Sequence, residues 1–280
     1  MKKVTMLVAV LCIAFAGLAQ DAGSKLETLI NAYAKLHRFN GAALVAKNGI
    51  IVLEKGYGNR NAGDKILNDE HTIFQLGSIT KQFTAAVILQ LQREKKLELS
   101  DKLGKYFPKY PKGDSITIQQ LLTHTAGIYN YTTDGKFMTN EITKPATREK
   151  MMVLFQDKPL DFSPGTSWNY SNSGYSLLGY IIEAVTKKTY EQAVRQYIFT
   201  PLHMTHSGFD FTHLNTSEKA IGYFKLNDKD AVTAPIVDST VSFSAGAMYS
   251  TIGDLYLWHK GLVSNAVLSK TQQEAAYTPV

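Results

Sequence analysis

The stretch from Phe74 to Gln92 contains a single charged residue, Lys81, among apolar and uncharged polar side chains. A helix that is apolar nearly all round is normally buried in the core of a protein. The chain is therefore expected to fold around this segment, with one lysine inside the core. Burial favours the neutral amine and lowers the pKa of a lysine, which is the property that a general base needs.

Ser78 lies three residues before Lys81. Residues i and i+3 share one face of a helix, so the hydroxyl and the amine can meet. Ser78 would also lie at the helix N-terminus, where backbone N–H groups and the helix dipole favour negative charge. The pair is thus a candidate nucleophile and base. The alternative makes Ser78 an N-cap and Lys81 a surface residue, although a cation in the first turn opposes the dipole.

A second group of candidate residues is Tyr170-Ser171-Asn172, in a loop rich in Gly, Ser and Asn. Tyrosine can relay a proton, and asparagine can accept a hydrogen bond from a lysine while donating another. The alternative is an ordinary turn followed by an N-cap, because Leu177, Leu178, Ile181, Ile182 and Val185 form the apolar face of a helix directly afterwards.

The remaining elements follow from periodicity and caps. Asn48-Gly49 separates the apolar runs Ala42–Ala46 and Ile50–Glu54, which predicts a β-hairpin. Helical spacing over Leu26–Leu36 precedes it. Capping patterns predict three further helices, which begin at Thr117-x-x-Gln120, Thr189-x-x-Gln192 and Thr251-x-x-Asp254. Pro201 is expected to stop the second of them, and the third is expected to be the last helix.

The composition is that of an ordinary globular protein, with 280 residues, 44% hydrophobic and 19% charged. The net charge of +6 is spread along the chain without an Arg/Lys tract, so no nucleic-acid partner is expected. Cys12 is the only cysteine, which excludes a disulfide framework and a thiol nucleophile from the mature chain. His203, His206 and His213 lack an acidic partner at helical spacing, so neither a metal nor a cofactor is expected.

Residues 1–19 have the pattern of a secretory signal peptide. Lys2 and Lys3 precede an apolar run from Val4 to Phe15, and Gly17-Leu18-Ala19 supplies small residues before a cleavage site. The run is short for a membrane anchor, and Leu11 before Cys12 disfavours a lipoprotein. The protein is therefore expected to be secreted or periplasmic, and to meet a membrane only through this segment before cleavage.

The motifs together resemble a known superfamily. Ser78-Ile79-Thr80-Lys81 after Phe74-Gln75-Leu76-Gly77, followed by Tyr170-Ser171-Asn172, resembles the first two motifs of serine beta-lactamases and penicillin-binding proteins. The Y-x-N form is similar to class C beta-lactamases, D-alanyl-D-alanine carboxypeptidases and family VIII esterases. Other stretches resemble the same group: Gly56-Tyr57-Gly58, Leu121-Leu122-Thr123-His124-Thr125-Ala126-Gly127, Pro201-Leu202-His203-Met204, Ser244-Ala245-Gly246 and Asp254-Leu255.

The resemblance implies a fold and roles. The fold would be α/β (α+β), with an antiparallel sheet flanked by helices and a mostly helical region. Ser78 would be acylated, Lys81 and Tyr170 would share the acid and base work, and Asn172 would orient Lys81 and the substrate amide. The backbone N–H of Ser78 would form half of an oxyanion hole. Possible substrate-binding residues at the edge of the cleft are Tyr57, Tyr129 and Trp168, each equally well explained by simple packing.

The superfamily's third motif, K-T-G or H-x-G on a strand, has no convincing match. His206-Ser207-Gly208 fits H-x-G but follows Asn172 too closely, and Lys270-Thr271 is followed by Gln272. Two strands cannot bury a sheet face alone, and few strand candidates follow the hairpin. We therefore expect residues 20–280 to form one hydrolase domain that is incomplete at its C-terminus, with the final strands and third motif beyond residue 280.

The predicted function is that of a secreted serine hydrolase that acts through an acyl-enzyme on an amide, ester or beta-lactam bond of a small molecule or a peptidoglycan peptide. Two alternatives stay open. One is a penicillin-binding or peptidoglycan-associated protein with little turnover, and the other is an inactive structural homologue. The sequence does not choose between beta-lactamase, esterase and D,D-peptidase, and it does not give the oligomeric state.

Overall fold

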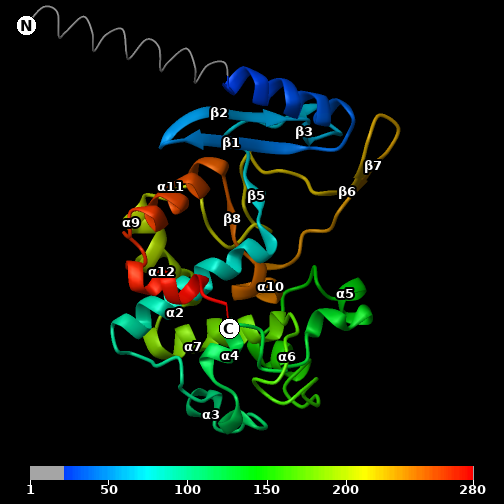
Figure 1. Ribbon diagram of the computed structural model, residues 1–280. Helices are drawn as coiled ribbons and strands as arrows, with labels where there is room; N and C mark the ends of the chain where they lie inside the picture. Colours follow the sequence, from blue (N-terminus) through cyan, green and yellow to red (C-terminus); the bar gives the residue numbers. More distant parts are fainter. Residues whose placement is uncertain (1–21, 280) are drawn as a thin grey trace, which may run out of the picture. The chain divides into compact units, whose positions relative to one another are not determined.

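The computed structural model describes residues 22–279, so the predicted signal peptide and Cys12 lie outside the described residues. The chain divides into two compact units (Figure 1). The first contains the chain up to Ile73 with Thr216–Ala234 and Thr251–Gly253, and the second contains Phe74–Asn215, Pro235–Ser250 and the chain from Asp254.

The first unit is built on the predicted hairpin. Strands β1 (Gly41–Lys47) and β2 (Ile50–Tyr57) pair antiparallel, and a helix over residues 22–35 precedes them, so both predictions are confirmed. Asn48 and Gly49 have φ values of 53° and 79°, the left-handed conformations that a two-residue hairpin turn requires. Two more antiparallel pairs complete this unit: β3 (Asn59–Asn61) with β4 (Ile66–Leu67), and β6 (Tyr223–Leu226) with β7 (Ala231–Thr233).

The second unit is helical and surrounds α2 (Thr80–Arg93), the segment that the lone lysine singled out. Its apolar side chains are almost fully buried, so the predicted central helix is confirmed. Phe83 of α2 stacks on Trp258 at 4.4 Å between ring centroids. The other main helices of this unit are α4 (Ile118–Leu122), α5 (Gly135–Asn140), α6 (Arg148–Val153), α7 (Asn172–Thr186), α8 (Tyr190–Val194), α10 (Ser239–Gly246), α11 (Ile252–Val263, whose first residues belong to the first unit) and α12 (Lys270–Tyr277).

Helix caps explain where several of these helices begin. Thr117 and Thr189 form complete capping boxes with Gln120 and Gln192, as predicted. The expectation that the helix after Thr251 is the last one is wrong. Ser269 forms a third capping box with Gln272 and begins α12, which follows α11.

Pro201 does not stop the helix that begins at Thr189. A wider turn over Arg195–Phe199 follows α8, and Pro201 lies inside the short helix α9 (Thr200–Leu202). Proline has no N–H for the carbonyl four residues earlier, which is that of Tyr197. That carbonyl instead accepts a hydrogen bond from the Gln90 side chain of α2, at 3.2 Å. The helical path therefore continues through the proline because α2 satisfies the freed carbonyl.

Helix α10 contains a sharp kink at Phe243, whose φ of 38° and ψ of −132° are not helical. A non-glycine residue in such a conformation costs about 1–3 kcal/mol and persists where its surroundings hold it. The Phe243 ring packs on Tyr180 and Tyr190. The kink turns the Ser244 carbonyl towards the Thr84 hydroxyl of α2, at 2.7 Å, and the next carbonyl towards Lys81.

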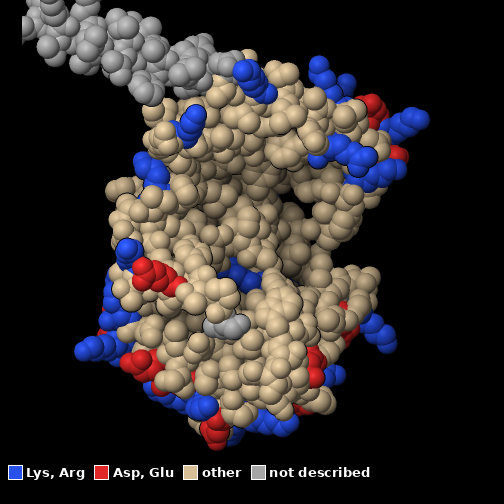
Figure 2. All heavy atoms as spheres, viewed as in Figure 1, with Lys and Arg blue, Asp and Glu red and all other residues tan. Residues whose placement is uncertain are grey.

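The surface of the second unit carries charges of both signs. On the face seen in Figure 2, basic and acidic side chains are interspersed around the edge of this unit, without a continuous basic patch. Within residues 22–279, no helix has both the length and the apolar character needed to cross a membrane.

Candidate active site

Ser78 lies in the first turn of the helical segment that leads into α2. Strand β5 (Phe74–Gln75) precedes it in the sequence and pairs antiparallel with β8 (Tyr249–Ser250). Gly77 then adopts a positive φ of 55° and begins the turn η1 (Gly77–Ile79). The Thr80 hydroxyl donates to the Gly77 carbonyl at 2.7 Å, which fixes this turn. The side chain of Ser78 is exposed, so its hydroxyl is open to a substrate.

Lys81 is buried, with 7% of its surface exposed, yet its amine reaches the Ser78 hydroxyl oxygen at 3.2 Å. It also donates to Asn172 Oδ1 at 2.7 Å and to the Ala245 carbonyl at 2.8 Å. All three acceptors are uncharged, and none is a carboxylate. The predicted proximity of Ser78 and Lys81 on one helix face is therefore present in the structure.

The charge of Lys81 is governed mainly by its burial. Burial disfavours the ammonium form and lowers the pKa of Lys81 from 10.5 to about 8. The rings of Tyr170 and Tyr175, at 4.7 and 5.5 Å from the amine, favour the ammonium form and so oppose the effect of burial. A lysine with this pKa supplies neutral amine near neutral pH and can accept a proton from Ser78.

Tyr170 is the second group that contacts the nucleophile. Its hydroxyl lies 2.7 Å from the Ser78 hydroxyl oxygen, within the range for proton transfer. Two proton-handling groups, an amine and a phenol, therefore meet at one serine oxygen. They come from α2 and from the loop before α7, which lie far apart in the sequence.

Asn172 is the first residue of α7, and hydrogen bonds fix the orientation of its side chain. Its Nδ2 donates to Thr132 Oγ1 at 3.0 Å, while its backbone N–H donates to Asn130 Oδ1 at 3.1 Å. With the amide nitrogen held in this way, Oδ1 faces Lys81. Ser171 is the N-cap of α7 and accepts a hydrogen bond from the Gly174 N–H at 3.2 Å, as the alternative prediction expected. Its neighbours Tyr170 and Asn172 instead contact Ser78 and Lys81.

His124 holds the loop that carries Tyr170. Its Nδ1 accepts a hydrogen bond from the Ser171 N–H at 3.1 Å, and its ring packs on the Tyr170 ring at 4.6 Å. Burial, with a smaller contribution from Lys81, lowers the pKa of His124 to about 4. The imidazole is therefore neutral near pH 7, as an accepting Nδ1 requires.

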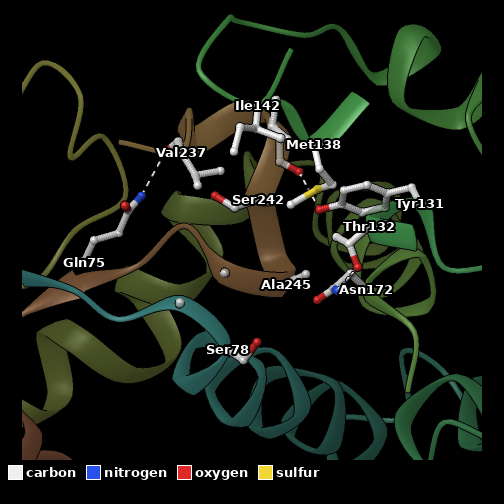
Figure 3. Close-up of a pocket in the computed structure, with 13 residues that line it drawn as sticks. Gln75, Ser78, Tyr131, Thr132, Met138, Ile142, Asn172, Val237, Ser242 and Ala245 are labelled. Atoms are coloured by element: carbon white, nitrogen blue, oxygen red, sulfur yellow. Dashed lines mark hydrogen bonds between the residues drawn. The ribbon is translucent and has the colours of Figure 1, made fainter. Parts of the chain in front are cut away.

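A pocket of about 270 Å³ opens beside Ser78 (Figure 3). Every lining residue belongs to the second unit. The lining comprises Gln75, Gly77, Ser78, Tyr131, Thr132, Met138, Ile142, Asn172, Val237, Val241, Ser242, Ala245 and Gly246. Ser78 and Asn172 are thus shared between the hydrogen-bonded cluster and the pocket.

None of the three aromatic residues predicted to bind substrate is among the residues that line this pocket. Tyr57 is buried in β2 of the first unit, with its ring against Phe39. Tyr129 packs against the core with Lys158 above its ring, and the next residue but one, Tyr131, lines the pocket instead. Trp168 is 63% exposed and lines a separate depression with residues such as Thr117 and Gln120.

The weak H-x-G match has a structural explanation. The hydroxyl of Ser207 is buried and donates to Asp254 at 2.7 Å, and the His206 N–H donates to the same carboxylate at 2.8 Å. Gly208 pairs with Tyr249. In the described part of the chain, no three His, Cys, Asp or Glu side chains form a group that could hold a metal ion.

Four contributors to the site were not identified from the sequence as such: His124, Asn130, Thr132 and the Ala245 carbonyl. His124 and Ala245 lie within segments that resemble the superfamily, but the resemblance of a segment does not predict which of its atoms contacts Lys81. Asn130 carried a local signal, since Asn is a preferred N-cap and here caps the turn η3 (Tyr131–Thr133).

The comparisons with known proteins define the class. The Beta-lactamase family model matches residues 26–280. The chain therefore belongs to the beta-lactamase family, within the superfamily of serine beta-lactamases and penicillin-binding proteins. The resemblance read from the motifs and the α/β fold class are both confirmed.

Particular relatives support the same class. The chain is 36% identical over 250 residues to the putative penicillin-binding protein PbpX of Bacillus subtilis, an alignment that covers 89% of this chain and 61% of that protein. A penicillin-binding protein from Bacillus halodurans superposes with a TM-score of 0.75 at 28% identity, covering 86% and 74% of the two chains. A D-stereospecific amidohydrolase from Streptomyces superposes with a TM-score of 0.67 at 32% identity, covering 75% and 66%. The chain thus spans less than two thirds of the length of PbpX.

Proposed function

We propose that this protein is a serine hydrolase that forms an acyl-enzyme on Ser78 and transfers the acyl group to water. The observation that carries the proposal is the meeting of Lys81 and Tyr170 at one serine oxygen, with Lys81 buried among uncharged acceptors. The similarity to a D-stereospecific amidohydrolase supports hydrolysis of an amide or a related acyl bond.

The proposed chemistry has two halves. In acylation, the Ser78 oxygen attacks a carbonyl carbon while its proton passes to the cluster of Lys81 and Tyr170, and the same cluster returns a proton to the leaving group. In deacylation, the cluster takes a proton from water, whose oxygen attacks the acyl carbon. The bond between that carbon and the Ser78 oxygen then breaks, and the cluster returns the proton to the Ser78 oxygen. Asn172 orients the Lys81 amine in both halves.

Placement of Ser78 at the start of a helical segment favours the developing negative charge. Backbone N–H groups at a helix N-terminus and the helix dipole stabilise an oxyanion, and the Ser78 N–H is one such group. At pH 7 and a pKa of about 8, roughly one Lys81 amine in ten is neutral, which is enough for a general base.

Covalent labelling tests the proposal. The protein, Ser78→Ala and the matched control Ser163→Ala, at an exposed serine, are treated with a fluorescent penicillin and with a fluorophosphonate. Labelling of the protein and of Ser163→Ala, and its loss in Ser78→Ala, is the expected result. Equal labelling of all three, or of none while all are folded, would contradict Ser78 as the nucleophile.

Turnover separates hydrolysis from binding. The similarity to PbpX, a putative penicillin-binding protein, favours a second candidate function in which the acyl-enzyme forms but hardly turns over. Release of product from p-nitrophenyl butyrate, nitrocefin or a D-Ala-D-Ala peptide over many cycles supports the hydrolase and names its class. A single burst that matches the enzyme concentration supports the binding protein.

We also propose export, because residues 1–19 have the composition of a signal peptide. N-terminal sequencing of the protein from fractionated cells would test it. The expected mature N-terminus is Gln20 in an extracytoplasmic fraction, and an intact Met1 in the cytoplasm would contradict it.

A further inference from the structure

The pocket beside Ser78 has a chemistry that points to a class of substrate. We propose that it binds the substituent of the acyl group, and that it selects an uncharged, apolar substituent. This inference rests on the proposed function, since it presumes that Ser78 becomes acylated. The acyl group remains bonded to the Ser78 oxygen after the leaving group departs, and Ser78 itself lines the pocket. The substituent is therefore within reach of the pocket in both halves of the reaction.

The walls of the pocket are apolar on the side away from the nucleophile. In Figure 3 the side chains of Met138, Ile142 and Val237 lie across the pocket from Ser78. Val241 and the ring of Tyr131 extend this surface. An apolar substituent placed there leaves water and gains about 25 cal/mol for each Å² of apolar surface buried.

No Lys, Arg, His, Asp or Glu is among the residues that line the pocket. The one ionisable side chain in the lining, Tyr131, donates its hydroxyl proton to the Val241 carbonyl at 3.0 Å, and burial raises the pKa of this phenol. A positively charged substituent would therefore lose its water without gaining an opposite charge, which is strongly unfavourable.

The polar side chains of the lining are already engaged with the protein. Gln75 Nε2 donates to the Val237 carbonyl at 2.9 Å, as Figure 3 shows. The Ser242 hydroxyl donates to the Asp238 carbonyl at 3.2 Å, and the Asn172 amide binds Lys81 and Thr132. Each of these side chains therefore has at least one hydrogen-bonding group occupied within the protein.

The volume of about 270 Å³ lies just below the range of about 300–1,000 Å³ that is usual for sites of drug-sized ligands. The pocket therefore fits one substituent and not a whole peptide. Met138 is the wall residue best suited to alteration, because it is only partly buried and belongs to the short helix α5.

Turnover of p-nitrophenyl esters with a constant leaving group tests the inference. The series runs from acetyl to butanoyl and hexanoyl, with Ser78→Ala as the background. We expect kcat/KM to rise about fourfold per methylene between acetyl and butanoyl, the ratio that corresponds to about 0.8 kcal/mol per buried CH₂. A flat or falling series would overturn the inference.

A pair of isosteric esters isolates charge from shape. The 5,5-dimethylhexanoyl ester is compared with the 4-(trimethylammonio)butanoyl ester, in which a cationic nitrogen replaces one carbon. We expect kcat/KM for the neutral ester to be at least about 100-fold higher, because the cation has no partner in the pocket. A cationic ester that reacts as fast as the neutral one would overturn the inference.

Variants of Met138 test the same preference from the side of the protein. Met138→Glu should reduce the preference for the neutral ester at least about tenfold, because a carboxylate pairs with the ammonium group. Met138→Leu, which conserves volume, should leave the preference unchanged, and fluorophosphonate labelling of Ser78 confirms that both variants fold. An unchanged preference in a folded Met138→Glu would contradict the inference. Hydrolysis that persists in Ser78→Ala would instead contradict the proposed function, so the two failures are distinguishable.

Discussion

The two ends of helix α2 each bring a lysine next to a tyrosine, and the two lysines behave in opposite ways. At the start of the helix, Lys81 is buried, contacts uncharged acceptors and has its pKa lowered to about 8. Just after the helix ends, Lys96 is partly exposed and pairs with the Glu94 carboxylate at 2.6 Å, within 3.2 Å of the Tyr197 hydroxyl. The hydrogen bond to Glu94 is the main cause that raises the pKa of Lys96.

The difference shows that a lysine beside a tyrosine is not by itself a catalytic pair. A nearby carboxylate favours the ammonium form, and exposure to water lets that form persist. Lys81 has neither, and it also contacts a serine oxygen that is open to a substrate. The absence of a carboxylate among its hydrogen-bond partners is therefore as important as the groups that are present.

Removal of the amine should have the largest effect on kcat/KM, and only at Lys81. Lys81→Met keeps the length of the side chain but loses the base, and should lower kcat/KM for an ester about 10³-fold, within the usual contribution of general base catalysis. Lys96→Met should change it less than about twofold, because an exposed ion pair contributes little. Steady-state kinetics on both variants checks this, and similar losses in the two would contradict the distinction.

Removal of each phenolic hydroxyl should have the next largest effect. Tyr170→Phe keeps the ring near Lys81 and His124 but loses the proton relay at Ser78, and should lower kcat/KM about 10²-fold. Tyr197→Phe is the matched control at the other end of α2 and should leave kcat/KM nearly unchanged. If Tyr170→Phe retains full activity, Lys81 alone handles the proton.

Introduction of a carboxylate should make Lys81 resemble Lys96. Asn172→Asp places an anion against the amine, which favours the ammonium form and raises the pKa of Lys81 above about 8. Activity at pH 7 should fall about 10- to 100-fold and recover towards higher pH, because the neutral amine forms only there. The pH–rate profile checks this against Asn172→Ala, and a midpoint that stays near 8 in Asn172→Asp would contradict the argument.

The support of the Tyr170 loop should give the smallest effect. His124→Phe loses the acceptor for the Ser171 N–H and should lower kcat about tenfold, with KM less affected. His124→Asn keeps an acceptor oxygen and tolerates the φ of 59° at this position, so it should recover much of the loss. Kinetics on both variants tests this, and a larger loss in His124→Asn than in His124→Phe would show that the ring, and not the hydrogen bond, holds the loop.

The sequence predicted the parts of the fold that depend on local patterns. The Asn48-Gly49 hairpin, the capping boxes at Thr117 and Thr189 and the buried helix around Lys81 all follow from short-range rules. The path through Pro201 could not be predicted in this way, because the Gln90 side chain that satisfies the freed carbonyl comes from a distant helix.

The same division applies to the site. Ser78 and Lys81 are one helical turn apart, so their proximity follows from the helix. Tyr170 and Asn172 were predicted from their residue types and from resemblance, and tertiary packing brings them to Ser78 and Lys81. The Ala245 carbonyl that reaches the amine follows the kink of α10 at Phe243, and nothing in the local sequence encodes that direction. Tyr131 lines the pocket and the predicted Tyr129 does not, a difference that likewise depends on side-chain orientation.

The most direct test of the account is the pH dependence of acylation of Ser78. The rate at which an ester acylates Ser78, or a fluorophosphonate phosphonylates it, is measured from pH 6 to pH 10 under single-turnover conditions. If neutral Lys81 is the base, the rate rises with pH and levels off above an apparent pKa of about 8, since deprotonation produces the active form. A rate that is independent of pH between 6 and 9, or that follows the ordinary lysine pKa of 10.5, would contradict a neutral Lys81 as the base.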